Sequence, residues 1–112
     1  MERCNVYTDA AAEADIREIV KYIAHGLGEP KTADKMGRRI YEEIFSLDTM
    51  PERYPLVRNR TLAREGYRMT SVGQYLIFYT VNAAAHAVHV RRVLYGRQDW
   101  LKLLQNSDYR EG

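Results

Sequence analysis

The sequence predicts an α+β domain: a small, mostly antiparallel sheet in the order β-α-α-β-β-β-α, with a helical hairpin packed on one face. Apolar residues recur at helical spacing through the first half of the chain. After Pro55 the spacing changes, and three apolar and aromatic runs follow, separated by tight connections. Because a helical stripe and a sheet face each need a partner surface, we expect the two halves to cover one another.

The first half contains a short strand and two helices. Residues 3–7 form the strand, and Thr8 or Asp9 supplies the N-cap of the first helix. The glycines and the proline of residues 26–30 end this helix and begin the second, which stops before Pro51 because a residue ahead of proline disfavours helical angles. The apolar face of the first helix comprises Ile16, Ile19, Val20, Ile23 and Leu27.

The second half contains an arginine-rich segment and three strands. Residues 56–65 are expected to form an exposed loop. The predicted strands are residues 66–72, 75–82 and 87–95. Residues 99–104 form a last helical turn or two, and residues 105–112 are expected to be a frayed tail. We therefore expect one domain over residues 1–112, with its core at about 5–104.

The composition limits the class of protein. A chain of 112 residues is one domain by the usual size prior. Cys4 is the only cysteine, so no intramolecular disulfide is possible and a reducing, cytoplasmic location is expected. The longest apolar run, residues 75–81, is far too short to cross a bilayer, and residues 1–10 lack the apolar stretch of a secretory signal. No membrane association is expected.

Charge is distributed unevenly along the chain. Residues 1–52 carry 7 basic and 11 acidic side chains, whereas residues 53–102 carry 9 basic and 2 acidic ones. All but one of those nine basic residues are arginines. Such asymmetry is typical of a protein with a polyanionic or acidic partner, although chance and surface solvation can also produce it.

The stretch VRRVLYGRQDW, residues 90–100, concentrates this charge on the last predicted strand. Strand alternation places Arg91 and Arg92 on opposite faces, and a single β-bulge would change which of them joins Tyr95. We expect Arg68 and one of these two arginines, with Tyr95, on the sheet face that the helices leave open. Guanidinium groups gathered there would suit phosphates, because they bind oxygens bidentately and keep their charge.

Other kinds of site find no support in the sequence. The three histidines are scattered, and the basic half has no paired carboxylates, so no metal site is predicted. There is no glycine-rich phosphate loop and no nucleophile with an obvious base. No cofactor is expected.

The chain resembles the RelE/ParE superfamily, the toxins of bacterial type II toxin–antitoxin systems. The resemblance spans about residues 5–104 and lies in the order of the elements and in four segments. These segments are EADIREIVKYIAHGLGEPKTADKM, LDTMPERYPLV, GYRMTSVGQYLIFYTV and VRRVLYGRQDW.

The mRNA-cleaving branch of this superfamily implies an endoribonuclease that acts with the ribosome. By position, Arg68 would orient the scissile phosphate, Arg92 would stabilise the transition state, and Tyr95 would take part in the acid–base step. The implied reaction is metal-free attack of an mRNA 2′-hydroxyl on the adjacent phosphate, with arginines neutralising the developing charge. Further contacts to nucleic acid would come from Arg58, Arg60, Arg64, Arg91 and Arg97.

A second branch poisons DNA gyrase and does not cut RNA. The phrase RVLYGRQDW resembles this branch as much as the first. On this alternative Arg92 and Tyr95 are part of the scaffold, and the segment that contains Trp100 carries the interaction. Both branches imply a small antitoxin that wraps the toxin with an acidic amphipathic segment, for which the basic half would be the electrostatic partner.

Overall fold

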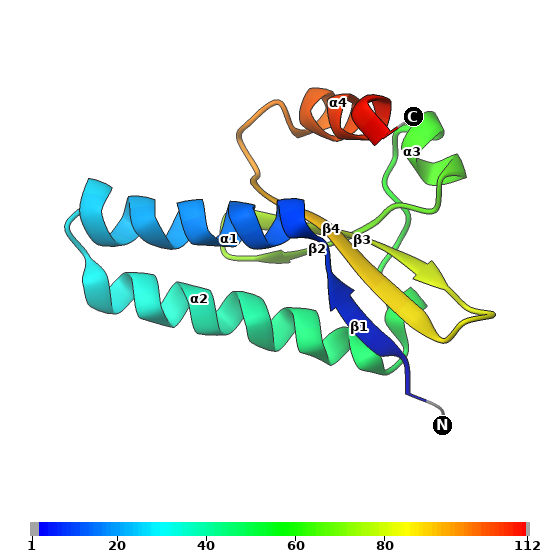
Figure 1. The fold of residues 1–112 in the computed structure, drawn as a ribbon, viewed down its shortest axis with the longest axis horizontal. Coiled ribbons are helices and arrows are strands. Elements are labelled where there is room, and N and C mark those ends of the chain that lie inside the picture. The colour runs from blue at the N-terminus through cyan, green and yellow to red at the C-terminus, as the bar shows by residue number, and fades with distance from the viewer. Residues whose placement is uncertain (1–2, 112) are drawn as a thin grey trace.

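The computed structural model describes residues 3–111, and side chains as far as Gln105, and it confirms the predicted α+β fold (Figure 1). Its main elements are β1 (Asn5–Thr8), α1 (Ala10–Lys21), α2 (Pro30–Phe45), α3 (Arg60–Arg64), β2 (Arg68–Val72), β3 (Tyr75–Asn82), β4 (Ala87–Tyr95) and α4 (Trp100–Glu111). A π-helical turn, Tyr22–Gly26, continues α1, and two 3₁₀ turns, Ser46–Asp48 and Pro51–Arg53, follow α2. No helix within the described range is long and apolar enough to cross a membrane.

The four strands form one mixed sheet in the order β1-β4-β3-β2. Strand β1 is parallel to β4, and the other two pairs are antiparallel. Because the chain turns into α1 directly after Thr8, β1 pairs only with Ala87–Val90 of β4. The outer edge of β4 from Arg91 to Tyr95 therefore lies beyond the end of β1.

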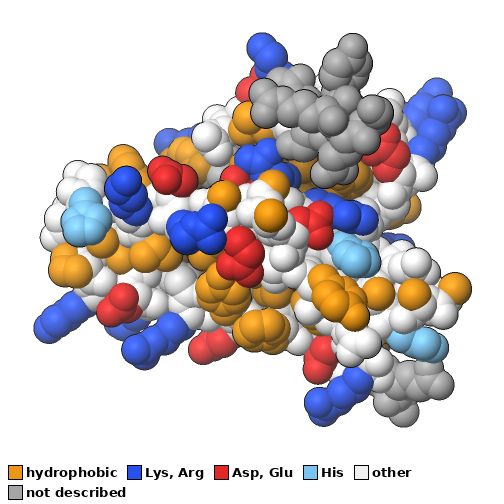
Figure 2. All heavy atoms as spheres, in the orientation of Figure 1, with side chains coloured by type: hydrophobic (Ala, Val, Ile, Leu, Met, Phe, Trp, Pro, Cys, Tyr) orange, Lys and Arg blue, Asp and Glu red, His pale blue; other side chains and the backbone are white. Residues whose placement is uncertain are grey.

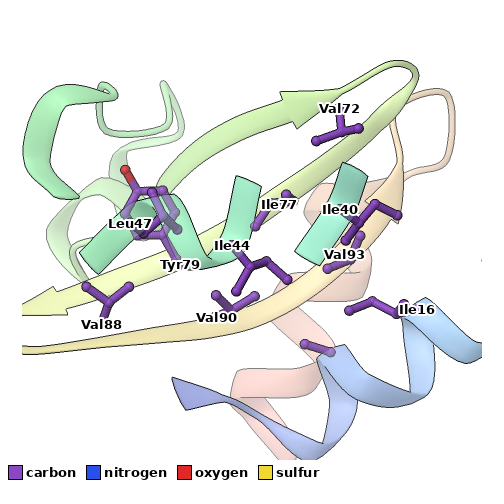
Figure 3. Packing of buried hydrophobic residues seen from close by; sticks show 11 residues of the cluster. Ile16, Ile40, Ile44, Leu47, Val72, Ile77, Tyr79, Val88, Val90 and Val93 are labelled. Atoms are coloured by element: carbon purple, nitrogen blue, oxygen red, sulfur yellow. The ribbon is translucent and has the colours of Figure 1, made fainter. Parts of the chain in front are cut away.

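The helical hairpin covers one face of the sheet, as predicted. Strands β3 and β4 point Ile77, Tyr79, Val88, Val90 and Val93 toward side chains from α1, α2 and the turn that follows α2, namely Ile16, Ile40, Ile44 and Leu47 (Figure 3). All nine side chains are 3% exposed or less. Burial of aliphatic side chains at roughly 1.5–3 kcal/mol each makes this cluster the main stabilising element of the fold.

The opposite face of the sheet is covered rather than open. Phe78 and Leu94 on that face are buried against Leu62 of α3 and Leu104 of α4. The Trp100 ring packs on Phe78 with centroids 5.2 Å apart. In Figure 1, α3 and α4 lie together on the side of the sheet away from α2. The expectation of a large open face is therefore wrong over this part of the sheet.

Two segments differ from the expectations in their local structure. The predicted loop at residues 56–65 contains α3, because the Asn59 side chain accepts a hydrogen bond from the Leu62 N–H at 3.0 Å and Leu62 is fully buried. Helix α4 extends to Glu111 and is longer than the one or two turns predicted. The expected frayed tail, residues 105–112, lies almost entirely outside the described side chains.

A β-bulge interrupts the pairing of β3 with β4. Phe78 pairs with Arg92, but the next residue, Tyr79, pairs with Val90, so Arg91 is an extra residue on β4. Arg91 nevertheless reaches Thr80 on β3 through its Nε, at 3.2 Å. The bulge thus brings both arginines to the side of the sheet away from the helical hairpin.

Candidate functional site

Arg92 is engaged by an acidic residue of α1. Its Nε donates to Asp15 Oδ2 at 2.6 Å and its Nη2 donates to Oδ1 at 2.8 Å, which is a bidentate pair. The same carboxylate accepts the Val93 N–H at 3.0 Å. The Arg92 and Asp15 side chains are only 19% and 13% exposed. The hydrogen bond to Asp15 raises the pKa of Arg92. The ion pair between Arg92 and Asp15 fixes α1 against β4.

Arg91 forms a second ion pair with the start of α1. Its Nη1 donates to Asp9 Oδ2 at 2.9 Å. His89 lies beside the same carboxylate, with its Nδ1 3.9 Å from Asp9 Oδ1, and stacks on the exposed ring of Tyr7. Both neighbouring arginines of β4 therefore bind acids from the first sixteen residues of the chain.

Arg68 lies on the opposite side of the sheet, facing the helical hairpin. It pairs in register with Tyr79, whose side chain belongs to the main core. Its Nη1 donates to the backbone carbonyls of Tyr54 at 2.6 Å and Glu52 at 3.2 Å, and its Nη2 lies 3.6 Å from the Glu52 carboxylate. Arg68 thereby holds the connection between α2 and α3 onto the edge of the sheet.

Tyr95 ends β4 on the helical side. It pairs in register with Tyr75, which in turn pairs with the core residue Val72. The Tyr75 and Tyr95 ring centroids are 5.8 Å apart. The backbone N–H of Tyr95 donates to Gln98 Oε1 at 3.2 Å.

The three residues predicted to act together are therefore dispersed. Arg68 and Tyr95 share the helical side, but Arg68 and Val72 are four positions apart on β2, which places Arg68 roughly 13 Å from the level of Tyr95. The Arg92 side chain starts on the other face of the sheet, although Arg92 and Tyr95 both line the groove at the edge of β4. The expectation that Arg68 and Tyr95 occupy the open face is wrong, because the register of β2 and β3 turns both toward the helices.

The remaining predicted contacts to nucleic acid lie on the surface. Arg58, Arg60, Arg64 and Arg97 are all exposed. None of them has an ion pair or side-chain hydrogen bond among the described residues. The first three flank or belong to α3, where Arg60 and Arg64 are four positions apart and so share one helical face.

Three tyrosines are shifted toward their neutral form. Burial, with a hydrogen bond to Glu13, raises the pKa of Tyr41 to about 12. Burial likewise raises the pKa of Tyr79 to about 12, and its hydroxyl donates to the Pro51 carbonyl at 2.6 Å. Burial also raises the pKa of Tyr75. These phenols act as buried hydrogen-bond donors or packing groups, not as bases.

The acidic partners of the arginines are functional residues of this region that the sequence pattern does not single out. Asp9, Asp15 and Glu52 come from the acidic part of the chain, residues 1–52, and bind Arg91, Arg92 and Arg68 from the basic part. The uneven distribution of charge was the available signal for these pairs. Pairing between the two parts of the chain is a third origin of this asymmetry, besides an external partner and surface solvation.

A groove runs beside the outer edge of β4, between α1 and the start of α4. Its volume is about 620 Å³. Its apolar and aromatic lining comprises Ile19, Tyr22, Leu27, Tyr75, Val93, Leu94, Tyr95 and Leu103. Tyr22 and Leu27 at its rim are 58% and 56% exposed. The volume and the apolar lining fall within the range of small-molecule sites.

Residues 6–100 match the sequence model of a family described as the ParE toxin of the type II toxin–antitoxin system parDE. This chain belongs to the ParE toxin family. The match covers most of the chain and confirms its place in the RelE/ParE superfamily. No protein of curated function matches the chain significantly.

Solved structures share the ParE fold of this chain. One is the RelBE2 toxin–antitoxin complex from Mycobacterium tuberculosis, at 21% identity and a TM-score of 0.61, covering 85% of this chain and 93% of that one. Another is a chromosomal ParDE system from P. aeruginosa, at 15% identity and a TM-score of 0.64, covering 83% and 96%. At these identities the likeness concerns the fold alone.

Proposed function

We propose that this toxin inhibits growth by holding DNA gyrase on cleaved DNA, and that a cognate antitoxin silences it. The positions of Arg68, Arg92 and Tyr95 are the reason for preferring the gyrase-poisoning branch over the mRNA-cleaving branch. Metal-free RNA cleavage needs its cationic and acid–base groups around one phosphate. Here Arg68 donates to backbone carbonyls and Arg92 to Asp15. Arg92 and Tyr95 line one groove, but Arg68 lies roughly 13 Å from the level of Tyr95 along the strands.

The family match also supports the gyrase proposal, because the matching family is described as the ParE toxin. An antitoxin partner is supported by the family description and by the two solved structures, which are toxin–antitoxin systems. We further propose that the exposed arginines of the α3 segment, Arg58, Arg60 and Arg64, contact the phosphates of DNA that gyrase holds. Their guanidinium groups have no partner among the described residues and so remain available to phosphate.

The test compares the two possible targets directly. Purified toxin is added to gyrase with supercoiled plasmid, and in parallel to ribosomes translating a defined mRNA. We expect linear plasmid to accumulate after protein denaturation, and the mRNA to keep its original ends. Cut mRNA without cleaved plasmid would reject the gyrase proposal and restore the nuclease hypothesis.

A variant of Tyr95 gives an independent test in cells. Tyr95→Phe removes the hydroxyl that an acid–base role requires but keeps the ring that packs on Tyr75. We expect its induced expression to inhibit growth as strongly as the wild-type chain, measured as viable counts at matched protein level. A loss of inhibition of a hundredfold or more, with the protein still folded, would indicate catalysis by Tyr95.

A further inference from the structure

A second groove lies where α1 and α2 meet on the outer surface of the helical hairpin. Its volume is about 510 Å³. Val20 of α1 and the small residues Ala33 and Gly37 of α2 line it between the two helices. A Cβ atom at Gly37 would lie 3.4 Å from Val20 Cγ2, so the glycine leaves a hollow above the valine. The atoms around this apolar hollow lack packing partners on one side.

An exposed aromatic residue also lines this groove. Phe45, the last residue of α2, is 59% exposed, and with Met50 it is the most exposed large hydrophobic side chain among the described residues. Its ring stacks on that of Tyr41, with centroids 6.0 Å apart and an interplanar angle of 26°. The Tyr41 hydroxyl donates to Glu13 Oε2 at 2.6 Å, which holds the tyrosine in place. An exposed aromatic side chain supported in this way is typical of a protein interface.

The charged side chains of this groove alternate in sign along α2. Asp34, Arg38 and Glu42 follow one another at intervals of four residues, so they share one side of the helix. All three are exposed and line the groove, and none forms an ion pair within the described part of the chain. In Figure 2, acidic, basic and hydrophobic side chains lie next to one another over α2. Such a row is complementary to an antiparallel copy of itself that is shifted by one helical turn.

We propose that this face binds a second copy of the chain, with the two α2 helices antiparallel about a two-fold axis near residue 40. One register brings Arg38 of each copy level with Glu42 of the other. The same register brings Phe45 level with residue 35, midway between Ala33 and Gly37 of the second copy, where the hollow lies. Each contact occurs twice, because a two-fold interface uses the same patch on both copies. The ion pairs select the register, and burial of the two phenylalanine rings supplies affinity.

The dimer leaves the other surfaces of the toxin accessible. In Figure 1, α3 and α4 lie on the side of the sheet away from α2. The arginines of the α3 segment and the groove beside β4 therefore stay uncovered in each copy, and dimerisation does not compete with the proposed contacts to DNA. Dimerisation is also independent of which cellular target the toxin acts on.

Sedimentation equilibrium of the purified toxin over a range of concentrations tests the dimer. We expect the mass of two chains, falling toward the mass of one chain on dilution. Phe45→Glu places a charge in the apolar hollow and should raise the dimer dissociation constant at least tenfold. Leu27→Glu is the matched control, since Leu27 is 56% exposed but lines the groove beside β4, and it should change the constant less than twofold.

Three results would overturn this dimer. They are the mass of one chain at every concentration, an unchanged dissociation constant in Phe45→Glu, and a loss confined to Leu27→Glu. A monomeric toxin that loses affinity for the protein encoded beside its gene on Phe45→Glu would assign the groove to that protein instead.

A charge exchange tests the register. Arg38→Glu sets like charges against each other across the interface and should weaken the dimer at least tenfold. The double variant Arg38→Glu, Glu42→Arg restores opposite charges between the copies, so its dissociation constant should return to within threefold of wild type. Circular dichroism checks the fold of each variant, whose substituted residues are all exposed. A double variant that dimerises as weakly as Arg38→Glu would overturn the proposed arrangement.

Discussion

Asp15 satisfies three donors at once, two from Arg92 and one from the β4 backbone. Asp15→Asn would remove the carboxylate charge that binds the poorly exposed guanidinium, and we expect the free energy of unfolding to fall by about 3 kcal/mol. Asp9→Asn is the control, because its pair with Arg91 is more exposed and should contribute about 1 kcal/mol or less. Urea unfolding measures both. Equal losses would show that the Asp15 pair has no special structural role.

Tyr41 and Tyr79 make stability depend on alkaline pH. In the unfolded chain a tyrosine ionises near pH 10, but burial raises the pKa of both in the fold to about 12. The folded state therefore holds protons that the unfolded state loses. Their stabilising contribution is complete below pH 10 and is lost as the pH rises to 12. Urea unfolding at pH 9 and pH 11 should show this decline, and Tyr79→Phe should reduce its size. An identical decline in the variant contradicts the assignment.

At the level of single residues, the sequence identified the basic side chains but not their partners. Arg68, Arg91 and Arg92 were visible as charges in strands, and strands rarely bury charge without compensation. Their partners lie 16, 82 and 77 positions away. Pairing over such distances depends on the bulge and on the register, which local patterns do not encode. The sequence therefore predicted a cluster where the structure has separate ion pairs.

At the level of elements, helix α4 is the cover of a second core. Leu104 is fully buried on the sheet face opposite the hairpin. We expect Leu104→Ala to lower the free energy of unfolding by about 3 kcal/mol, the cost of a cavity in a packed core. Lys102→Ala, on the exposed side of the same helix, should change it by about 0.5 kcal/mol or less. A similarly small effect of Leu104→Ala would mean that α4 packs only loosely on the sheet.

The strands and long helices were predictable because each carries a sustained period of apolar residues. The second core was less visible, since its members come from short segments. Leu62 is the single fully buried residue of five-residue α3, and no period can be read from one residue. The bulge at Arg91 adds one residue to β4 without any glycine or proline to mark it. Short elements and irregular pairing thus account for most of the differences.

At the level of the whole molecule, part of the charge asymmetry along the chain is compensated by ion pairs within the protein. Asp9, Asp15 and Glu52 of the acidic part bind arginines of the basic part. On the face drawn in Figure 2, acidic and basic side chains are interspersed over the surface and do not form one continuous basic patch. An external polyanion would therefore meet the arginines left unpaired, foremost those of the α3 segment.

The three arginines of the α3 segment can be tested as a group. A triple variant, Arg58, Arg60 and Arg64 to Gln, should weaken binding of a labelled DNA duplex at least tenfold, measured by fluorescence anisotropy. The affinity of the wild-type chain should fall steeply with salt, and the slope should shrink in the variant, because each phosphate contact releases a counterion. The matched control changes Arg17, Arg38 and Arg39, which are also exposed but lie on α1 and α2.

The control removes the same three charges, so it isolates position from net charge. We expect it to retain most of the DNA affinity. Equal losses in the two triple variants would mean that only net charge matters, and the α3 segment would then have no specific role. Binding of poly-glutamate but not of DNA by the wild-type chain would reassign the segment to an acidic protein partner. Retained DNA binding in the α3 variant, with loss in the control, would place the contact on the helical hairpin instead.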